Sequence, residues 1–359
     1  MKKKERMLRQ AGALSSDDDF SRLVEAGVSY EQVISYFVRP NVAWFTAKDI
    51  INLVECEVPP DVARQYAAKR LRASEIIVLY RNGISPDDEL LTDYYYSDVE
   101  LDFSPYYVLR NIPSSWYREY VSPYKKYPGK RTFEKITNAF VQEQTPTFVQ
   151  RELKKSCGLL TLGRYSPSLL EELARNLDQA YQSEKPVALS LLARDDWNGN
   201  YHLDTDIYQH IAKKYKLFIY EIASPRAAFK AITTCGTYHG RTASGEPLKP
   251  IELLLICGHG NKDSLTLADF PHEKTLNRDQ RKQFRSVKPY VTGTVIINSC
   301  STGEGGKEEE NFATSVFSAM QPQRLYAPME SEIGLLAIDF HPIVPHFTCG
   351  MKRTLVLER

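Results

Sequence analysis

Two short apolar runs, each ending in a turn of small residues, decide the fold of this chain: IELLLICGHG at residues 251–260 and TVIINSCSTG at residues 294–303. Runs of this length, rich in Ile, Leu and Val, are typical of strands buried on both faces of a parallel sheet. The first turn carries His259 between two glycines, and the second carries Cys300. Because the carboxyl ends of parallel neighbours lie side by side, where open α/β sheets bind ligands, we expect a base and a nucleophile to meet there.

Expected strands alternate with expected helices on both sides of these runs. The strands are expected at Val187–Leu192, Leu217–Ile222, Ile251–Cys257, Thr294–Asn298 and Arg324–Ala327. Helices are expected at Phe133–Glu143, Thr147–Lys155, directly after the N-cap residue Ser166, and at Thr205–Lys214, Ser224–Thr234, Asn277–Arg285 and Glu309–Met320. This alternation predicts an α/β fold, a three-layer sandwich with right-handed crossovers and a mostly parallel sheet. The tail at residues 338–358 has β character but no clear place in it.

The first ninety residues have a helical pattern with a loose internal echo: LVEAGVSYEQV from Leu23, LVECEVPPDVA from Leu53 and LYRNGISPDDEL from Leu79. In each echo an apolar helix end is followed by a turn, a Val or Ile, and a Ser or Pro that opens the next helix. The pattern fits stacked helix-turn-helix repeats, and it fits equally a plain helical bundle whose turns share the same chemistry. In both cases residues 1–90 are expected to form a regulatory or recruitment module, which could bind a regulatory protein, rather than to catalyse.

Residues 91–130 differ in composition from what precedes them, with nine tyrosines between Tyr94 and Tyr127, together with Trp116 and four prolines. Proline at this density interrupts helices and central strands, whereas so many aromatic rings do not suit a solvated linker. We expect an ordered strap packed on the surface, with a partner-binding strip as the alternative. The expected domains are a helical module at 1–90, this strap at 91–130, and an α/β domain at 131–359.

The overall composition excludes several classes of protein. With 359 residues and a formal net charge of +1, the chain shows no general charge signal for nucleic acid or an anionic membrane. No apolar run approaches the roughly eighteen residues of a membrane span, and no apolar segment follows the basic N-terminus as in a secretory signal. Six cysteines without a CxxC pair indicate thiols in a reducing, cytoplasmic setting. No nucleotide, HExxH or EF-hand motif is present, so no cofactor or metal is expected.

The chemistry of a Cys–His pair requires a thiolate for attack and a proton for the leaving group. An imidazole next to the thiol meets both needs because it titrates near neutral pH. Glycine beside His259 lets the backbone approach a substrate carbonyl closely, so the N–H groups of Gly260 and Cys300 could stabilise the oxyanion. The alternative is that the histidine and the cysteine are structural, since unpaired cysteines are often buried as small apolar residues.

The two runs resemble the caspase-like superfamily of cysteine peptidases (clan CD), which includes caspases, metacaspases, gingipains, clostripain, legumain, separase and bacterial CHAT domains. Members share an apolar strand ending in His-Gly and a later strand ending in small-x-Cys, here LLLICGHG and VIINSCSTG. The sequence after the cysteine, STGEGGKEEENFATSVFSAM, is similar to CHAT-type domains. The resemblance covers residues 185–331. It implies His259 as general acid and base, Cys300 as nucleophile and Gly260 as an oxyanion donor, without a required third catalytic side chain.

The resemblance also indicates where a substrate side chain would bind. The residue two before the nucleophile is Asn298, which is neutral. The loop after the first strand offers Asp195 and Asp196, which would favour a basic side chain, and Arg194, which would favour an acidic one. Further acids follow the fifth strand and the nucleophile, namely Glu330, Glu332 and Glu304. Acids outnumber the single arginine, so cleavage after Lys or Arg is the favoured interpretation.

Two loops near the expected site are candidates for self-cleavage. The loop TCGTYHGRTASGEPLKP contains a second His-Gly pair, His239-Gly240, but no strand directly precedes it, so we interpret it as a loop. The second loop is the acidic segment GEGGKEEEN at residues 303–311. The basic residues available for self-cleavage are Arg241, Lys262 and Lys307.

The sequence therefore predicts a cysteine endopeptidase that cleaves protein or peptide substrates. Two alternatives stay open: a catalytically silent relative that serves as a binding module or scaffold, and a cysteine hydrolase or acyltransferase that acts on bonds other than peptide bonds.

Overall fold

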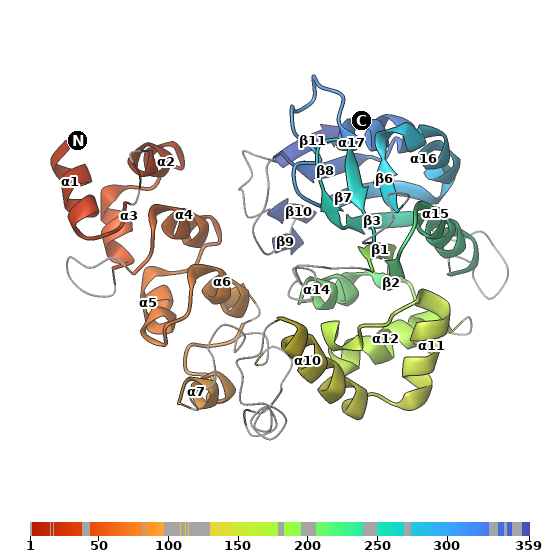
Figure 1. Ribbon diagram of the computed structural model, residues 1–359, viewed down its shortest axis with the longest axis horizontal. Coiled ribbons are helices and arrows are strands. Elements are labelled where there is room, and N and C mark those ends of the chain that lie inside the picture. Colours follow the sequence, from red (N-terminus) through yellow and green to blue (C-terminus); the bar gives the residue numbers. More distant parts are fainter. Residues whose placement is uncertain are drawn as a thin grey trace. The chain divides into compact units, whose positions relative to one another are not determined.

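The structure is a computed structural model that describes residues 2–14, 16, 18–37, 44–81, 83–96, 108, 112, 114, 130–178, 183–194, 206–239, 250–268, 274–329, 337–340, 343–346 and 354–359. The chain divides into two compact units, Met1–Pro128 and Gly129–Arg359 (Figure 1). The expected start of the α/β part, residue 131, lies two residues from this division.

The described secondary structure of the first unit is helical. Its main helices are α1 (Lys2–Gln10), α2 (Asp19–Glu25), α3 (Tyr30–Ser35), α4 (Ala47–Glu55), α5 (Pro60–Ala68), α6 (Ala73–Arg81) and α7 (Glu89–Tyr96). Helix α7 includes the first residues of the expected strap, so that part is helical and the boundary expected at residue 90 lies inside a helix. Apart from Val108, Ile112, Ser114 and Lys130, the rest of the expected strap lies outside the described residues.

The three echoes in the sequence have one turn geometry. Each has a residue of positive φ after its helix, at Gly27 (φ 75), Glu57 (φ 54) and Gly83 (φ 71). The next residue is apolar, and its N–H donates to the carbonyl five residues earlier, as in a Schellman turn. These bonds run from Val28 to Leu23 at 2.9 Å, from Val58 to Leu53 at 3.0 Å and from Ile84 to Leu79 at 3.0 Å.

Three tyrosines repeat one contact: the hydroxyl of each donates a hydrogen bond to a backbone carbonyl about twenty residues later in the chain. Tyr36 donates to the carbonyl of Val58 at 2.7 Å, Tyr66 donates to the carbonyl of Ile84, and Tyr94 donates to the carbonyl of Ile112 at 2.8 Å. The first two acceptors are the apolar residues of the turns just described. The echo thus corresponds to a repeated turn joined by a repeated hydrogen bond.

The second unit contains a six-stranded, mostly parallel sheet. Its strands are β1 (Val187–Ala193), β2 (Lys216–Ile222), β3 (Ile251–Cys257), β7 (Val291–Asn298), β8 (Arg324–Pro328) and β11 (Thr354–Glu358), in the order β11-β8-β7-β3-β1-β2. All neighbours are parallel except β11, which is antiparallel to β8. The tail without a clear place in the sequence pattern therefore supplies an edge strand.

Helices cover both faces of this sheet. Helix α14 (Asp206–Lys214) leads from β1 to β2, whereas α15 (Pro225–Thr234), α16 (Arg281–Val287) and α17 (Phe312–Met320) follow connections that run the other way across the sheet. Right-handed crossovers then put α14 on one face and the other three on the opposite face (Figure 1). The Phe284 ring contacts Phe229 at 5.1 Å and Phe312 at 6.0 Å between centroids, which joins the three helices into one layer.

The layer that contains α14 also includes helices from before the first strand. They are α10 (Lys130–Gln144), α11 (Thr147–Cys157), the 3₁₀ turn η3 (Leu162–Arg164) and α12 (Pro167–Leu177). Ser166 is the N-cap of α12, since its side chain accepts a hydrogen bond from the Leu169 N–H at 3.3 Å. The Asn176 side chain donates to the Leu217 carbonyl at 2.9 Å, so this layer also covers the edge strand β2.

Short elements depart from the predicted pattern. Strands β4 (His259–Gly260), β5 (Ser264–Thr266) and β6 (Thr275–Asn277) form a small antiparallel sheet after β3. Strands β9 (Ala337–Phe340) and β10 (Ile343–His346) form an antiparallel pair. The helix expected from Glu309 begins at Phe312, because the Asn311 side chain caps it by accepting from the Thr314 N–H.

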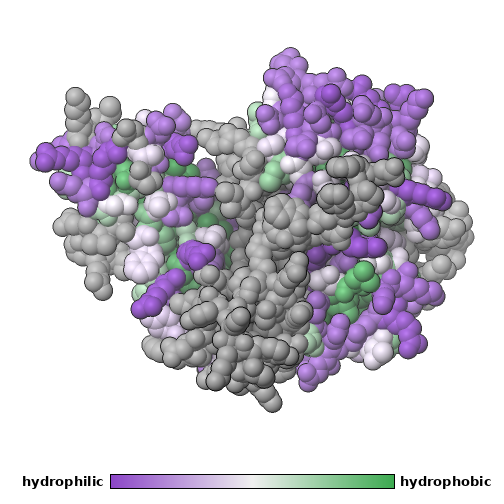
Figure 2. Space-filling view, viewed as in Figure 1, coloured by the Kyte–Doolittle hydropathy of each residue, from purple (hydrophilic) through white to green (hydrophobic). Residues whose placement is uncertain are grey.

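The core of the second unit is formed by the central strands and the inner faces of both helical layers. Every residue of β1 is buried, and all but one residue of β3 is buried, as expected for strands covered on both sides. In Figure 2 the region of α16 and α17 presents a mainly hydrophilic surface. No helix in the described part of the chain is long and apolar enough to cross a membrane.

Candidate active site

The register of β3 and β7 relates the two sequence motifs. Cys257 at the end of β3 pairs with Asn298 at the end of β7, an offset of 298 − 257 = 41. His259 and Cys300 have the same offset, 300 − 259 = 41, and each lies two residues beyond its strand. The Gly258 N–H donates to the Asn298 carbonyl at 3.2 Å, so the bonding continues past the strand end. The histidine and the cysteine therefore leave adjacent parallel strands at equivalent positions.

His259 and Cys300 are both half-buried after their strands end. His259 belongs to β4, where it pairs with Thr266 of β5. Cys300 is a thiol outside any disulfide, and the next residue, Ser301, adopts a left-handed conformation at φ 52. A residue other than Gly, Asn or Asp in this region is uncommon and marks a sharp turn. The backbone therefore turns abruptly directly after Cys300.

Gly260 brings the two turns into direct contact. A Cβ at this position would overlap the Ser299 Oγ and would lie 3.0 Å from the Thr302 Cγ2 and 3.1 Å from the Ser264 carbonyl oxygen. Ser299 and Thr302 flank Cys300 in the sequence, and Gly260 follows His259. The absence of a side chain at Gly260 is what allows the two turns to pack this closely.

The turn after Cys300 is fixed by backbone and side-chain bonds. The Gly303 N–H donates to the Pro328 carbonyl of β8 at 2.8 Å, and the Ala313 N–H donates to the Thr302 carbonyl at 3.1 Å. The buried Asn311 amide donates to the carbonyls of Glu304 at 3.1 Å and Gly306 at 3.0 Å. These contacts define the path of the segment between Cys300 and α17.

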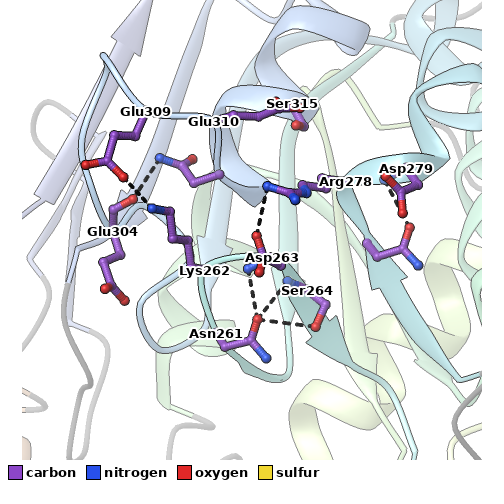
Figure 3. A network of polar contacts seen from close by, with 12 residues as sticks. Asn261, Lys262, Asp263, Ser264, Arg278, Asp279, Glu304, Glu309, Glu310 and Ser315 are labelled. Atoms are coloured by element: carbon purple, nitrogen blue, oxygen red, sulfur yellow. Dashed lines mark hydrogen bonds and ion pairs between the residues drawn. The ribbon is translucent and has the colours of Figure 1, made fainter.

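Ion pairs link the turn after His259 to the segment after Cys300 (Figure 3). Lys262 pairs with Glu309, and its carbonyl accepts from the Phe312 N–H at 2.7 Å. Nearby pairs are Arg278–Asp263 at 3.1 Å and Arg281–Glu310 at 2.6 Å. All three pairs are well exposed, so solvent screens them, and the backbone bonds matter more for the geometry.

The predicted pocket residues divide into described and undescribed positions. Asn298 is 8 % exposed at the end of β7, two residues before Cys300. Glu304 is exposed, and its N–H donates to the Ser301 carbonyl at 3.1 Å. The expectations for Asp195, Asp196, Glu330 and Glu332 fall outside the described residues, as does the one for Arg241.

Arg194 directly follows β1. Its N–H is shared between the Ile222 carbonyl of β2 at 2.9 Å and the Leu267 carbonyl, which follows β5, at 3.1 Å. Its Nη2 lies 3.5 Å from where a Gly158 Cβ would be, next to the C-terminus of α11. Negative charge at that helix end and on Glu221 attracts the guanidinium. The guanidinium is therefore placed near Gly158 and the β2 edge of the sheet.

A buried polar cluster lies beside the strand ends. The Arg164 Nη1 and the Glu221 carboxylate form an ion pair at 3.7 Å, and Glu221 also accepts from the Leu160 N–H at 3.0 Å. Burial raises the pKa of Glu221, although Arg164 and the backbone bonds oppose this shift. Closer to the site, the Tyr208 hydroxyl contacts the Cys257 Sγ at 3.9 Å and accepts from Ser190 at 3.1 Å. These contacts join β1 and β3 to α14, and β2 to the segment between α11 and α12.

The second His-Gly pair has a different setting from the first. His239 ends a π-helical turn, Cys235–His239, that continues α15, and Gly240 lies outside the described residues. A helix rather than a strand precedes it, so it is not equivalent to His259. Among the described residues, no group of three or more His, Cys, Asp and Glu side chains could hold a metal ion.

Two contributors to the site were not expected from the sequence. Ser299 contacts Gly260, a contact that depends on packing between distant turns and has no sequence signal. Asn311 does have a sequence signal, because an Asn before an apolar helical run is a common N-cap.

No protein-family model matches the chain, and no relative is found among curated proteins.

Proposed function

We propose that this chain is a cysteine endopeptidase of the caspase-like type, acting on protein substrates through Cys300 and His259. The observation that carries the proposal is the common offset of forty-one residues in the β3–β7 register and between the two side chains. Contact between Gly260 and Ser299 supports it, because these residues adjoin His259 and Cys300. The mostly parallel sheet covered on both faces is the architecture that the resemblance implies.

The proposed reaction uses each group in turn. The Cys300 thiolate attacks the carbonyl carbon of the scissile bond, and the carbonyl oxygen takes up negative charge. The N–H groups of Gly260 and Cys300 stabilise that charge, a kind of contact worth about 10²–10³ in rate per donor. His259 then protonates the amine as the C–N bond breaks. Water hydrolyses the acyl-enzyme after giving a proton to His259, which restores the thiol.

A basic side chain before the scissile bond is the proposed preference. Arg194, the described cation that would favour an acidic side chain, is directed towards Gly158 and Glu221. Asn298 is neutral, and the remaining candidates, Asp195, Asp196 and Glu330, are acids. The site is therefore proposed to lack a cation at the position where an acidic substrate side chain would need one.

The first unit is proposed to recruit or restrain, and self-processing is proposed as a secondary activity. Of the basic positions that could be cut, Lys307 suits cleavage better than Lys262. Lys307 is exposed in a turn. By contrast, the Lys262 carbonyl is bonded to the Phe312 N–H and its side chain is paired with Glu309. An accessible, unpaired carbonyl is what a peptidase needs to bind a segment.

The test is covalent labelling with a peptidyl acyloxymethyl ketone that ends in Arg, followed by profiling on a diverse peptide library. Labelling at Cys300 should be lost in Cys300→Ala and in His259→Ala, whereas Cys56→Ala should label normally. Intact mass of the incubated protein reports self-processing. Labelling without cleavage of any library peptide would favour a silent scaffold or another acyl-transfer reaction and would contradict the peptidase proposal. Labelling that survives in Cys300→Ala would contradict the assigned nucleophile.

A further inference from the structure

Ser299 carries a hydroxyl group that is buried and has no hydrogen-bond partner in the described structure. The residue is 3 % exposed, and its Oγ is among the few buried side-chain atoms without such a partner. Leaving a buried polar group unpaired costs about 1–3 kcal/mol, which an alanine at the same place would avoid. Orphan polar groups of this kind need an explanation, and functional roles are among the common ones.

The position of this hydroxyl is specific. Ser299 directly precedes Cys300, and its Oγ faces the Cα of Gly260 on the side where a Cβ would be. The neighbouring Thr302 hydroxyl is already engaged, donating to the Ser299 carbonyl at 3.3 Å. The peptide that joins His259 to Gly260 ends at the Gly260 Cα, which the Ser299 hydroxyl faces. The N–H of that peptide is the proposed oxyanion donor.

We propose that Ser299 is a positioning residue for the oxyanion donor: its hydroxyl donates to the His259 carbonyl as the transition state forms. This proposal rests on the proposed function. In a trans peptide the N–H and the C=O point in opposite directions, so a bond to the His259 carbonyl fixes the direction of the Gly260 N–H. A donor on the carbonyl also polarises the peptide, which strengthens its N–H as a donor.

A role during the reaction accounts for a hydroxyl that is buried and unpaired in the substrate-free molecule. The hydroxyl is unpaired before the reaction and paired during it, so its bond contributes to the transition state and not to the ground state. An interaction formed only in the transition state raises kcat and leaves KM unchanged. A purely structural role would instead change the stability and would not separate these two constants.

The experiment compares Ser299→Ala with Tyr165→Phe in the full chain. Tyr165 is 0 % exposed and its hydroxyl is also buried without a partner, but it lies between η3 and α12, outside the two catalytic turns. Both substitutions remove an orphan hydroxyl, so both should raise the melting temperature, by about 2–4 °C for a domain of this size. Only Ser299→Ala should lower kcat, by about tenfold, with KM unchanged, on the best peptide amide from the library.

Three results would overturn the positioning role of Ser299. A kcat for Ser299→Ala within twofold of the wild type would overturn the positioning role, as would an equal loss in Tyr165→Phe. A lower melting temperature in Ser299→Ala would show that the hydroxyl is already paired without substrate, which also overturns it. If the wild-type chain cleaves no peptide at all, the proposed function fails first, and that failure is recognisable because it does not depend on Ser299.

Discussion

At the scale of single residues, Gly260 is a position where the candidate site has no room for a side chain. An added Cβ would overlap the Ser299 Oγ and would press on the Thr302 Cγ2 at 3.0 Å. The Ser264 carbonyl at 3.1 Å closes the third side. The turn that carries His259 would therefore have to move away from the turn that carries Cys300. Displacement of a reacting group by about 1 Å can cost on the order of 10² in rate.

Gly260→Ala is accordingly predicted to lower both stability and activity. We expect a loss of about 1–3 kcal/mol in the free energy of unfolding, as for other overpacked sites. The loss should be smaller when Ser299→Ala is present as well, because that change removes the closest obstructing atom. Urea unfolding of the two single variants and the double variant measures this coupling. Strictly additive effects would show that the two positions do not touch.

At the scale of elements, the sequence predicted the central strands well and the short ones poorly. The strand at Ile251–Cys257 was predicted with the bounds that the structure has, because a long apolar run stops at a glycine. Strands β4, β5 and β6 contain only two or three residues, too few to show an alternating pattern. Strand β11 was missed as a member of the sheet because its partner, β8, is fixed only by tertiary packing.

The candidate site, too, could be predicted only where it depends on sequence pattern and not on tertiary packing. The sequence placed His259 and Cys300 at two strand ends, and the β3–β7 register shows that these ends are adjacent. It could not show the contact between Gly260 and Ser299, nor that Arg194 is directed towards Gly158, since both depend on how loops pack. The direction in which a charged loop side chain points is known only from the structure, because a loop has no periodic sequence pattern that fixes side-chain orientation.

Strand β2 carries the group with the clearest expected pH dependence. Burial raises the pKa of Glu221 above its value in the unfolded chain, 4.5. The folded state therefore keeps a proton that the unfolded state loses as the pH rises. The stabilising contribution is full below the unfolded pKa and is lost as the pH rises through the folded pKa.

Glu221→Gln should remove this dependence, since the amide stays neutral at every pH. The free energy of unfolding of the Gln variant, relative to the wild type, should increase between pH 4.5 and the raised pKa of the carboxyl group. Urea unfolding at a series of pH values measures it. A difference that is constant across this window, or that falls with pH, would mean that Arg164 compensates the burial of the carboxylate fully.

At the scale of the whole molecule, the candidate site belongs to the second unit alone. The described site residues and the continuous core from Val141 to Leu357 all lie within Gly129–Arg359. A shortened chain of residues 129–359 is therefore expected to fold and to be labelled at Cys300. Circular dichroism and the acyloxymethyl ketone probe check this. A faster labelling rate than in the full chain would assign a restraining role to the first unit, and an unfolded product would contradict the independence of the second.

The repeated tyrosine bond in the first unit has a consequence for how such a unit could have grown. Tyr66 donates forward to the turn at Ile84, and the turn of its own hairpin receives the bond from Tyr36. One hairpin thus carries both a donor for its successor and an acceptor for its predecessor. A duplicated gene segment encoding one hairpin would supply both ends of the new junction at once, so the array could lengthen or shorten in inheritance by whole hairpins without a compensating mutation.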